Sequence, residues 1–175
     1  MKTEVVGEVV FVSGNIWSLE RPRILVVVCS DGRYQPCIDE FLSQCLHIEN
    51  YDRLYAPGGP GVLSSNLHSF FRGDQFRQEM NFLVHAHLLD RIVLIFHGAS
   101  QDGGPPEATC ADYARKLPFS TVAEIEKQQE KDLVEVIRAI YKINSKPNLS
   151  AYRAEVRADR RVQFVEMPIP SLSYY

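Results

Sequence analysis

The sequence predicts an α/β domain with a mainly parallel central sheet, flanking helices and an antiparallel hairpin at one edge. Two continuous apolar runs, Ile24–Cys29 and residues 91–96, are typical of strands buried on both faces of a parallel sheet. Segments with the apolar spacing of helices lie between and after these runs, and two β-rich segments close the chain. Strands that alternate with helices favour an α/β sheet over a bundle or a sandwich.

Length and composition indicate one ordinary globular domain over residues 1–175. The chain has 175 residues, 45% of them hydrophobic and 23% charged, which is enough for one core. We expect a strand or arm in residues 1–20 and an irregular tail in residues 168–175.

Charge and hydropathy exclude some classes of partner. The formal net charge of −3 lacks the basic excess of a nucleic-acid-binding domain. No apolar run reaches the roughly 18 residues that cross a bilayer. The first eight residues carry acids where a signal peptide needs a basic and then an apolar stretch. We therefore expect a cytoplasmic protein without a nucleic-acid or membrane partner.

The first half of the chain alternates strand and helix signals. Residues 4–12 are rich in β-branched side chains and predict a strand, and Ile24–Cys29 predicts the first buried strand. Pro36 suits the first position of a helix, which we expect over residues 37–46. Residues 53–56 predict a shorter strand, and it leads into the Gly/Pro-rich loop of residues 57–61.

The second half continues the alternation and ends in a hairpin. We expect a helix over residues 73–89 that buries Phe76, Met80, Phe82, Leu83 and Leu88, and a strand over residues 91–96. Further helices are expected at residues 106–116 and after Ser120 or Thr121, with Glu124 in the first turn. Residues 149–156 and 161–167 predict a hairpin.

Three polar or glycine-rich clusters follow predicted strands, at residues 29–33, 56–61 and 97–104. In α/β sheets, ligands bind at the carboxyl ends of the strands. The clusters should therefore meet at one edge of the sheet and form a single site there.

The clusters contain the side chains of a zinc centre. Cys29 and His97 offer a thiolate and an imidazole, both natural zinc ligands. Asp31 and Arg33 alternate along the turn after Cys29, and an arginine–carboxylate pair is strong and directional. The pair would keep Asp31 ionised and aimed at an attacking hydroxide.

These motifs give the sequence a resemblance to the β-class carbonic anhydrases. That family has C-x-D-x-R after a buried strand, then a strand ending in a glycine-rich loop, then a strand ending in H-x-x-C. The chain has Cys29-Ser30-Asp31-Gly32-Arg33, then Ala56-Pro57-Gly58-Gly59, then His97-Gly98-Ala99-Ser100, and the resemblance spans residues 23–166.

The resemblance implies reversible hydration of carbon dioxide to bicarbonate at a zinc site in a homodimer. Cys29 and His97 would be zinc ligands, and Asp31 and Arg33 would be catalytic. The backbone amides of Gly58 and Gly59 would help shape the substrate pocket.

One ligand position departs from the family pattern, because Ser100 stands where the family has its second cysteine. A neutral hydroxyl is a poor zinc ligand compared with a thiolate. Asp31, Cys37, Asp102 and Cys110 remain as candidates for the third ligand.

Two other histidines are weaker candidates for zinc ligands, and two other functions remain as alternatives. His85 and His87 close a helix that runs toward the opposite end of the sheet, so they are poorer choices of ligand. The protein is alternatively a metal-free module that binds a small anion, such as bicarbonate or phosphate, near Arg33. Hydrolysis of a carbon dioxide analogue on the same fold is a third possibility.

Overall fold

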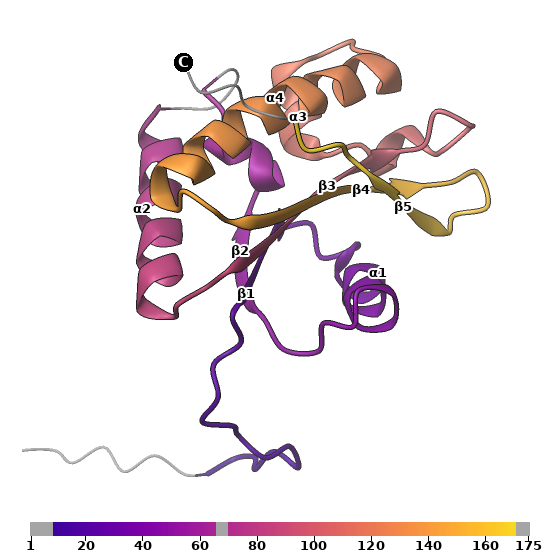
Figure 1. Cartoon of the computed structure of the whole chain (residues 1–175). Helices are drawn as coiled ribbons and strands as arrows, with labels where there is room; N and C mark the ends of the chain where they lie inside the picture. Colours follow the sequence, from indigo (N-terminus) through magenta and orange to yellow (C-terminus); the bar gives the residue numbers. More distant parts are fainter. Residues whose placement is uncertain (1–8, 66–69, 171–175) are drawn as a thin grey trace, which may run out of the picture.

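A five-stranded sheet forms the centre of the computed structural model, which describes residues 9–65 and 70–170 (Figure 1). The strand order is β2-β1-β3-β4-β5, in which β1 pairs in parallel with β2 and β3, β3 pairs in parallel with β4, and β5 is antiparallel to β4. The strands are β1 (Ile24–Cys29), β2 (Asp52–Ala56), β3 (Arg91–Ala99), β4 (Asn148–Val156) and β5 (Val162–Glu166). The predicted parallel sheet with an antiparallel edge hairpin is confirmed.

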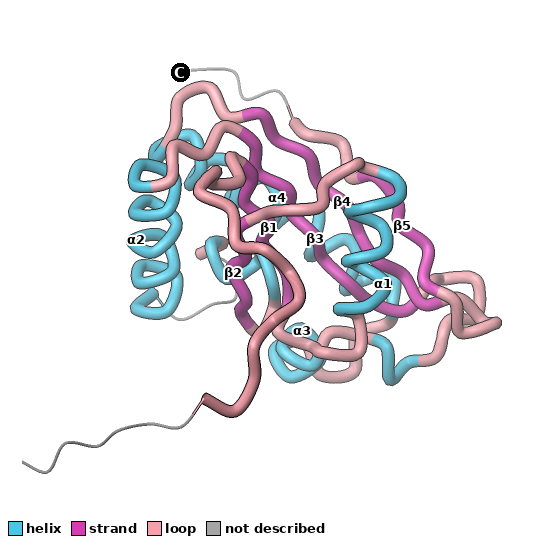
Figure 2. The backbone as a smooth tube through the Cα atoms, turned by 90° about the horizontal axis from the view of Figure 1, so that it is seen from below, coloured by secondary structure: helices cyan, strands magenta, loops and turns pink. Residues whose placement is uncertain are grey.

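Helices cover both faces of the sheet (Figure 2). Helix α1 (Gln35–Glu40), continued by the π-helical turn η1 (Phe41–Cys45), packs against one face. Helices α2 (Phe70–Ala86) and α4 (Val122–Ile143) pack against the other. The short helices are η2 (Gly59–Leu63), η3 (Pro106–Ala108) and α3 (Ala111–Lys116).

The position of β1 between two layers of helices explains why its sequence is apolar throughout. Leu25 and Val27 contribute to the core beneath α2 and α4, whereas Val26 and Val28 contribute to the core beneath α1. Successive side chains point to opposite faces of a strand, so a strand between two helical layers is apolar at every position.

The start of α4 follows the predicted capping pattern. The Thr121 hydroxyl accepts a hydrogen bond from the backbone N–H of Glu124, and the Glu124 carboxylate accepts one from the backbone N–H of Thr121. This capping box satisfies two N–H groups that have no partner within the helix.

Several element predictions need correction. Residues 9–12 form no strand, because no described strand pairs with them, and residues 4–8 lie outside the described residues. The glycine-rich loop includes a short 3-10 helix, η2. The helix predicted over residues 106–116 is divided into η3 and α3, since Cys110 has a non-helical backbone and begins α3 as its N-cap.

The buried side of α2 is narrower than predicted. Phe76 and Met80 are buried and Leu83 is partly buried, but Phe82 is exposed, because α2 packs against the sheet along one face only. Leu88 is also exposed, and it lies beyond the end of α2 at Ala86. Within the described part of the chain, no helix has the length and apolar character needed to cross a membrane.

Candidate metal centre

Cys29, His97 and Cys110 converge at the carboxyl edge of the sheet. Cys29 is the last residue of β1, His97 lies two residues before the end of β3, and Cys110 is the N-cap of α3. Their ligand atoms all lie within 4.8 Å of one another, and all three residues are buried. Three distant segments therefore bring two sulfurs and an imidazole to one point.

The spacing of the two sulfurs fits a tetrahedral zinc ion. The sulfurs of Cys29 and Cys110 are 3.9 Å apart. Two sulfurs at about 2.3 Å from zinc and at the tetrahedral angle lie about 3.8 Å apart. Both ring nitrogens of His97 are buried and lack a hydrogen-bond partner among the described residues. A buried polar atom without a partner is costly, and a metal ion would satisfy one of these two nitrogens.

The pKa values of the two thiols are shifted in opposite directions. The neighbouring Cys110 thiol holds the pKa of Cys29 far below its usual range, against the opposing effect of burial, with help from the nearby His97 imidazole and the backbone amide of Asp31. The Cys29 thiolate and burial raise the pKa of Cys110. Zinc binds cysteine sulfurs as thiolates, so a cation that binds both sulfurs would release the protons that they hold.

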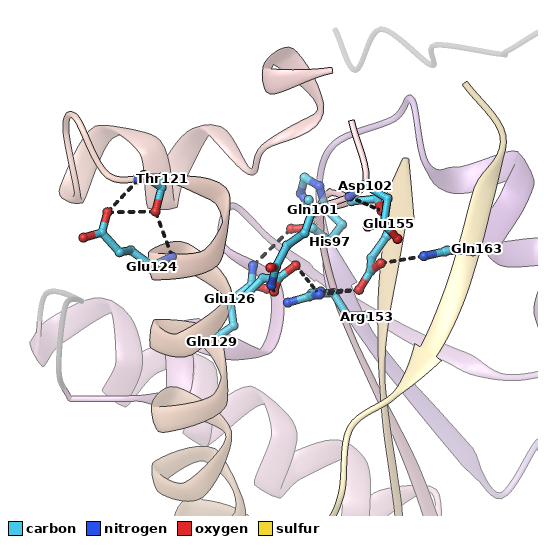
Figure 3. Close-up of polar contacts among 12 residues, drawn as sticks. His97, Gln101, Asp102, Thr121, Glu124, Glu126, Gln129, Arg153, Glu155 and Gln163 are labelled. Carbon is cyan, nitrogen blue, oxygen red and sulfur yellow. Dashed lines mark hydrogen bonds and ion pairs between the residues drawn. The ribbon is translucent and has the colours of Figure 1, made fainter. Parts of the chain in front are cut away.

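The backbone and ring of His97 are fixed from both sides of the sheet. On the α4 side, Gln129 is almost fully buried, and its Nε2 donates a hydrogen bond of 3.0 Å to the carbonyl oxygen of His97 (Figure 3). On the α1 side, the buried Tyr34 ring lies 4.2 Å from the imidazole, measured between ring centroids. The Tyr34 hydroxyl donates to the carbonyl oxygen of Ala108 at 2.7 Å. These contacts orient the imidazole and leave its nitrogens free for a ligand.

A buried ionic cluster supports the same end of β3 (Figure 3). Arg153 of β4 contacts the carboxylates of both Glu126 of α4 and Glu155 of β4. Gln163 of β5 donates to Glu155 at 2.7 Å, and Gln101, in the loop after β3, donates to Glu126. The cluster ties α4 to the strands and to the loop that follows His97.

Cys110 is held in place through the residue three positions later. The Tyr113 hydroxyl of α3 donates a hydrogen bond of 2.7 Å to the fully buried carboxylate of Asp132. The same carboxylate accepts hydrogen bonds of 2.9 Å from the Ser64 hydroxyl and from the Gln128 amide. Asp132 thereby joins α3, α4 and the end of η2 beside the cysteine cluster.

Asp31 and Arg33 form the predicted pair. Arg33 Nε donates to Asp31 Oδ1 at 2.9 Å, and Arg33 Nη2 lies 2.5 Å from Asp31 Oδ2. Hydrogen bonds from Arg33 hold the pKa of Asp31 below its usual range. Arg33 Nη1 also donates to the backbone carbonyl of Glu107 at 3.1 Å, so the guanidinium links the turn after β1 to η3.

The two glycines of the second cluster have left-handed backbones, with φ of 91° at Gly58 and 57° at Gly59. A Cβ atom on Gly59 would lie 3.0 Å from the backbone nitrogen of Cys29 and 3.3 Å from the carbonyl oxygen of Ile95. The glycine therefore lets the loop after β2 lie directly against the end of β1 and the middle of β3.

Of the four candidates for a third ligand, the structure brings Cys110 to Cys29 and His97. Asp31, Cys37 and Asp102 are not part of this group of donor atoms. Ser100 is buried, and its hydroxyl accepts a hydrogen bond from the backbone N–H of Asp102 at 3.3 Å.

The two histidines judged poor ligands lie elsewhere. His85 is exposed near the end of α2. Nδ1 of His87 lies 2.6 Å from an oxygen of Asp52, at the amino end of β2. Both positions agree with a helix that runs away from the site edge.

Sequence patterns alone did not identify Tyr34, Gln129 and Asp132 as site residues. One signal was present, because Gln129 and Asp132 interrupt the apolar face of α4 beside Ile125 and Leu133. Polar residues on the buried face of a helix need partners inside the protein, and here those partners are His97 and Tyr113.

Comparisons with solved structures identify the fold. A carbonic anhydrase from Streptococcus mutans aligns with a TM-score of 0.51 and 17% identity, over 89% of this chain and 88% of that chain. The β-carbonic anhydrase CcaA aligns with a TM-score of 0.49 and 14% identity, over 84% of this chain and 78% of that one. A β-carbonic anhydrase from Trichomonas vaginalis aligns with a TM-score of 0.43 and 15% identity, over 90% and 88% of the two chains.

The likeness in fold has no counterpart in the comparisons of sequence. No protein-family model matches it, and no curated protein matches it either. The structural likeness confirms the predicted carbonic-anhydrase-like fold over most of the chain, and the site residues must carry any functional argument.

Proposed function

Because the chain has a carbonic-anhydrase-like fold, we propose that it catalyses the reversible hydration of carbon dioxide to bicarbonate at a zinc site with a relocated third ligand. The observation that carries the proposal is the convergence of Cys29, His97 and Cys110 around an imidazole whose two nitrogens lack hydrogen-bond partners among the described residues.

Cys29, His97 and Cys110 would hold the zinc ion. Two thiolates and one imidazole form a donor set found in catalytic zinc sites, which use three protein ligands. Zinc bound there would supply the Lewis acidity that makes water a nucleophile near neutral pH.

Asp31 and Arg33 would orient the reacting water. The Arg33 hydrogen bonds keep the Asp31 carboxylate ionised. Arg33 Nε shares its proton between the two oxygens of Asp31, at 2.9 and 3.2 Å, and the longer of these two contacts would give way to a hydrogen bond from a water molecule. Arg33 fixes the direction of the carboxylate, because it contacts both oxygens in a bidentate pair.

Two structural features would shape the space around the reacting carbon dioxide. Gly58 and Gly59 bring backbone amides close to the end of β1 without any side chain. The Tyr34 ring covers the His97 imidazole from the α1 side, so bulk water does not reach the imidazole from there.

Zinc content and hydration rate test the proposal together. We expect about one zinc per subunit in protein purified without chelator, and catalysed hydration of carbon dioxide by stopped-flow. Cys110→Ser should lose both zinc and activity, because a hydroxyl replaces the third donor. Ser100→Ala should retain zinc, and Cys45→Ser, which changes an exposed cysteine outside the cluster, serves as the control.

The outcomes separate this function from its alternative. A wild-type protein that takes up no zinc, and gains no activity after zinc is added, would refute the enzymatic proposal. The metal-free anion-binding alternative would then stand. Loss of zinc in Ser100→Ala with retention in Cys110→Ser would assign the third ligand to Ser100 instead. Cobalt substitution gives a second readout, because thiolate–cobalt absorption reports how many sulfurs bind.

We also propose that the protein works as a cytoplasmic homodimer. The segment of residues 9–22 extends away from the sheet (Figure 1) and carries exposed large apolar side chains, at Val9, Val10, Phe11, Val12, Ile16, Trp17 and Leu19. Such a concentration is typical of an interaction surface, and a second copy of the chain would cover it. Free buried cysteines fit a reducing compartment.

Analytical ultracentrifugation tests the dimer. A variant with Phe11→Ser and Trp17→Ser should sediment as a monomer. Phe119→Ser, which changes an equally exposed aromatic side chain outside this segment, should not change the mass. A monomeric wild type would refute the dimer proposal.

A further inference from the structure

A cavity lies on the α1 side of the sheet, and none of Cys29, His97 and Cys110 lines it. It has a volume of about 530 Å³ and is formed by the start of α1, by η3 and by the β4–β5 hairpin. Tyr34 lines this cavity and also contacts the His97 ring, so its ring separates the cavity from the candidate metal centre.

Two guanidinium groups and one carboxylate line the cavity. Arg33 and Arg160 line it, with Glu107 as the opposing acid. Arg33 is already committed to Asp31 and to the backbone carbonyl of Glu107. No ion pair within residues 9–65 and 70–170 includes Arg160, whose backbone N–H closes the hairpin turn by bonding to the carbonyl oxygen of Arg157 at 2.9 Å. Arg160 is therefore available to an anion.

The other walls of the cavity are apolar. Tyr34, Val156 and Val162 contribute ring and aliphatic surface beside the two arginines. A cavity with apolar walls and a few polar groups suits a small molecule that is apolar at one end and charged at the other. An arginine side chain matches the geometry of a carboxylate group.

We propose that this cavity binds a small organic monocarboxylate with a short aliphatic body, and that Arg160 receives the carboxylate. The aliphatic part lies against Val156 and Val162. Zinc plays no part in this binding, so the proposal does not depend on the proposed hydration activity.

Cys37 provides a chemical probe for the cavity, because it is one of the lining residues. Iodoacetate is itself a small carboxylate. The Cys37 sulfur attacks its methylene carbon, a carbon–sulfur bond forms as iodide leaves, and the thiol proton passes to water. Iodoacetamide reacts in the same way but carries no charge. The ratio of the two rates at one cysteine therefore measures attraction of the carboxylate.

Cys45 is the matched control, since it is exposed and is not a lining residue. We expect the iodoacetate-to-iodoacetamide rate ratio at Cys37 to exceed that at Cys45 by about tenfold, the effect of one charge-assisted hydrogen bond. Peptide mass spectrometry after digestion assigns each label to its cysteine. Equal ratios at the two cysteines would refute the proposal.

Two variants of the hairpin make the test specific. Arg160→Gln should lower the ratio at Cys37 to that at Cys45. Arg161→Gln should leave the ratio unchanged, because Arg161 is outside the lining and pairs with Asp159 at 2.6 Å. An unchanged ratio in Arg160→Gln would show that Arg160 does not receive the carboxylate.

Protection by butyrate gives an independent measurement. Butyrate should slow the reaction of iodoacetamide with Cys37 and not with Cys45, whereas chloride at equal ionic strength should slow neither. Equal protection by chloride would reveal general screening and overturn the proposal. The same result is expected with and without zinc, so failure of this test and failure of the proposed enzyme are distinguishable.

Discussion

Replacing Asp132 with asparagine should destabilise the protein and weaken its metal centre together. The Asp132 carboxylate is fully buried and accepts from Tyr113, Ser64 and Gln128 at 2.7–2.9 Å. An asparagine keeps one oxygen acceptor, so at least one donor loses a charge-assisted bond worth about 1.5–3 kcal/mol. Asparagine also removes a buried charge, which offsets part of that loss. We expect the free energy of unfolding to fall by about 2 kcal/mol.

Urea denaturation measures this change, and Asp102→Asn at an exposed position should stay within about 0.5 kcal/mol of wild type. Tyr113→Phe removes one donor, and the double variant should cost clearly less than the sum of the two single changes. Zinc affinity should weaken in Asp132→Asn, because Tyr113 holds the helix that begins at Cys110. Wild-type stability in Asp132→Asn, or strict additivity with Tyr113→Phe, would refute the reasoning.

Three further predictions concern the turn after β1, the glycine-rich loop and the cap of α4. In Arg33→Gln, the free energy of unfolding at pH 7 should fall by about 0.5–1 kcal/mol, since Arg33 is largely exposed. The pKa of Asp31 is lower in the folded protein than its usual 3.8, so the pair stabilises above that pH. The difference from wild type should disappear as the pH falls through the folded pKa, and a constant difference across acid titration would contradict the pairing. Gly59→Ala should cost about 1–2 kcal/mol in thermal or urea unfolding, because φ is positive and backbone atoms lie 3.0–3.3 Å from the added carbon. Gly32→Ala, with open space around the added carbon, is its control, and equal stability of the two variants would count against the close packing. Thr121→Ala should lower stability by about 1 kcal/mol through loss of the helix cap, and an unchanged unfolding midpoint would argue against the cap.

Local patterns in the sequence were sufficient for most of the fold. The fully apolar run at Ile24–Cys29 predicted a central strand, because a strand between two helical layers buries both of its faces. Thr121 and Glu124 marked the start of α4 through their spacing. The N-terminal strand was wrong over residues 9–12, because β-branched residues form a strand only where a partner strand is available.

In the candidate site too, local patterns predicted some residues and only the tertiary structure placed the others. The sequence by itself indicated Cys29 and His97, since each follows or ends a buried strand, and Asp31 with Arg33, since they lie two residues apart in one turn. Cys110 lies 81 residues after Cys29, and among the four candidates no local pattern favoured it. Only the tertiary structure brought Cys110 to the other two residues. A metal centre depends on distances of a few ångströms between side chains, and such distances are set by how helices and strands pack across the whole fold.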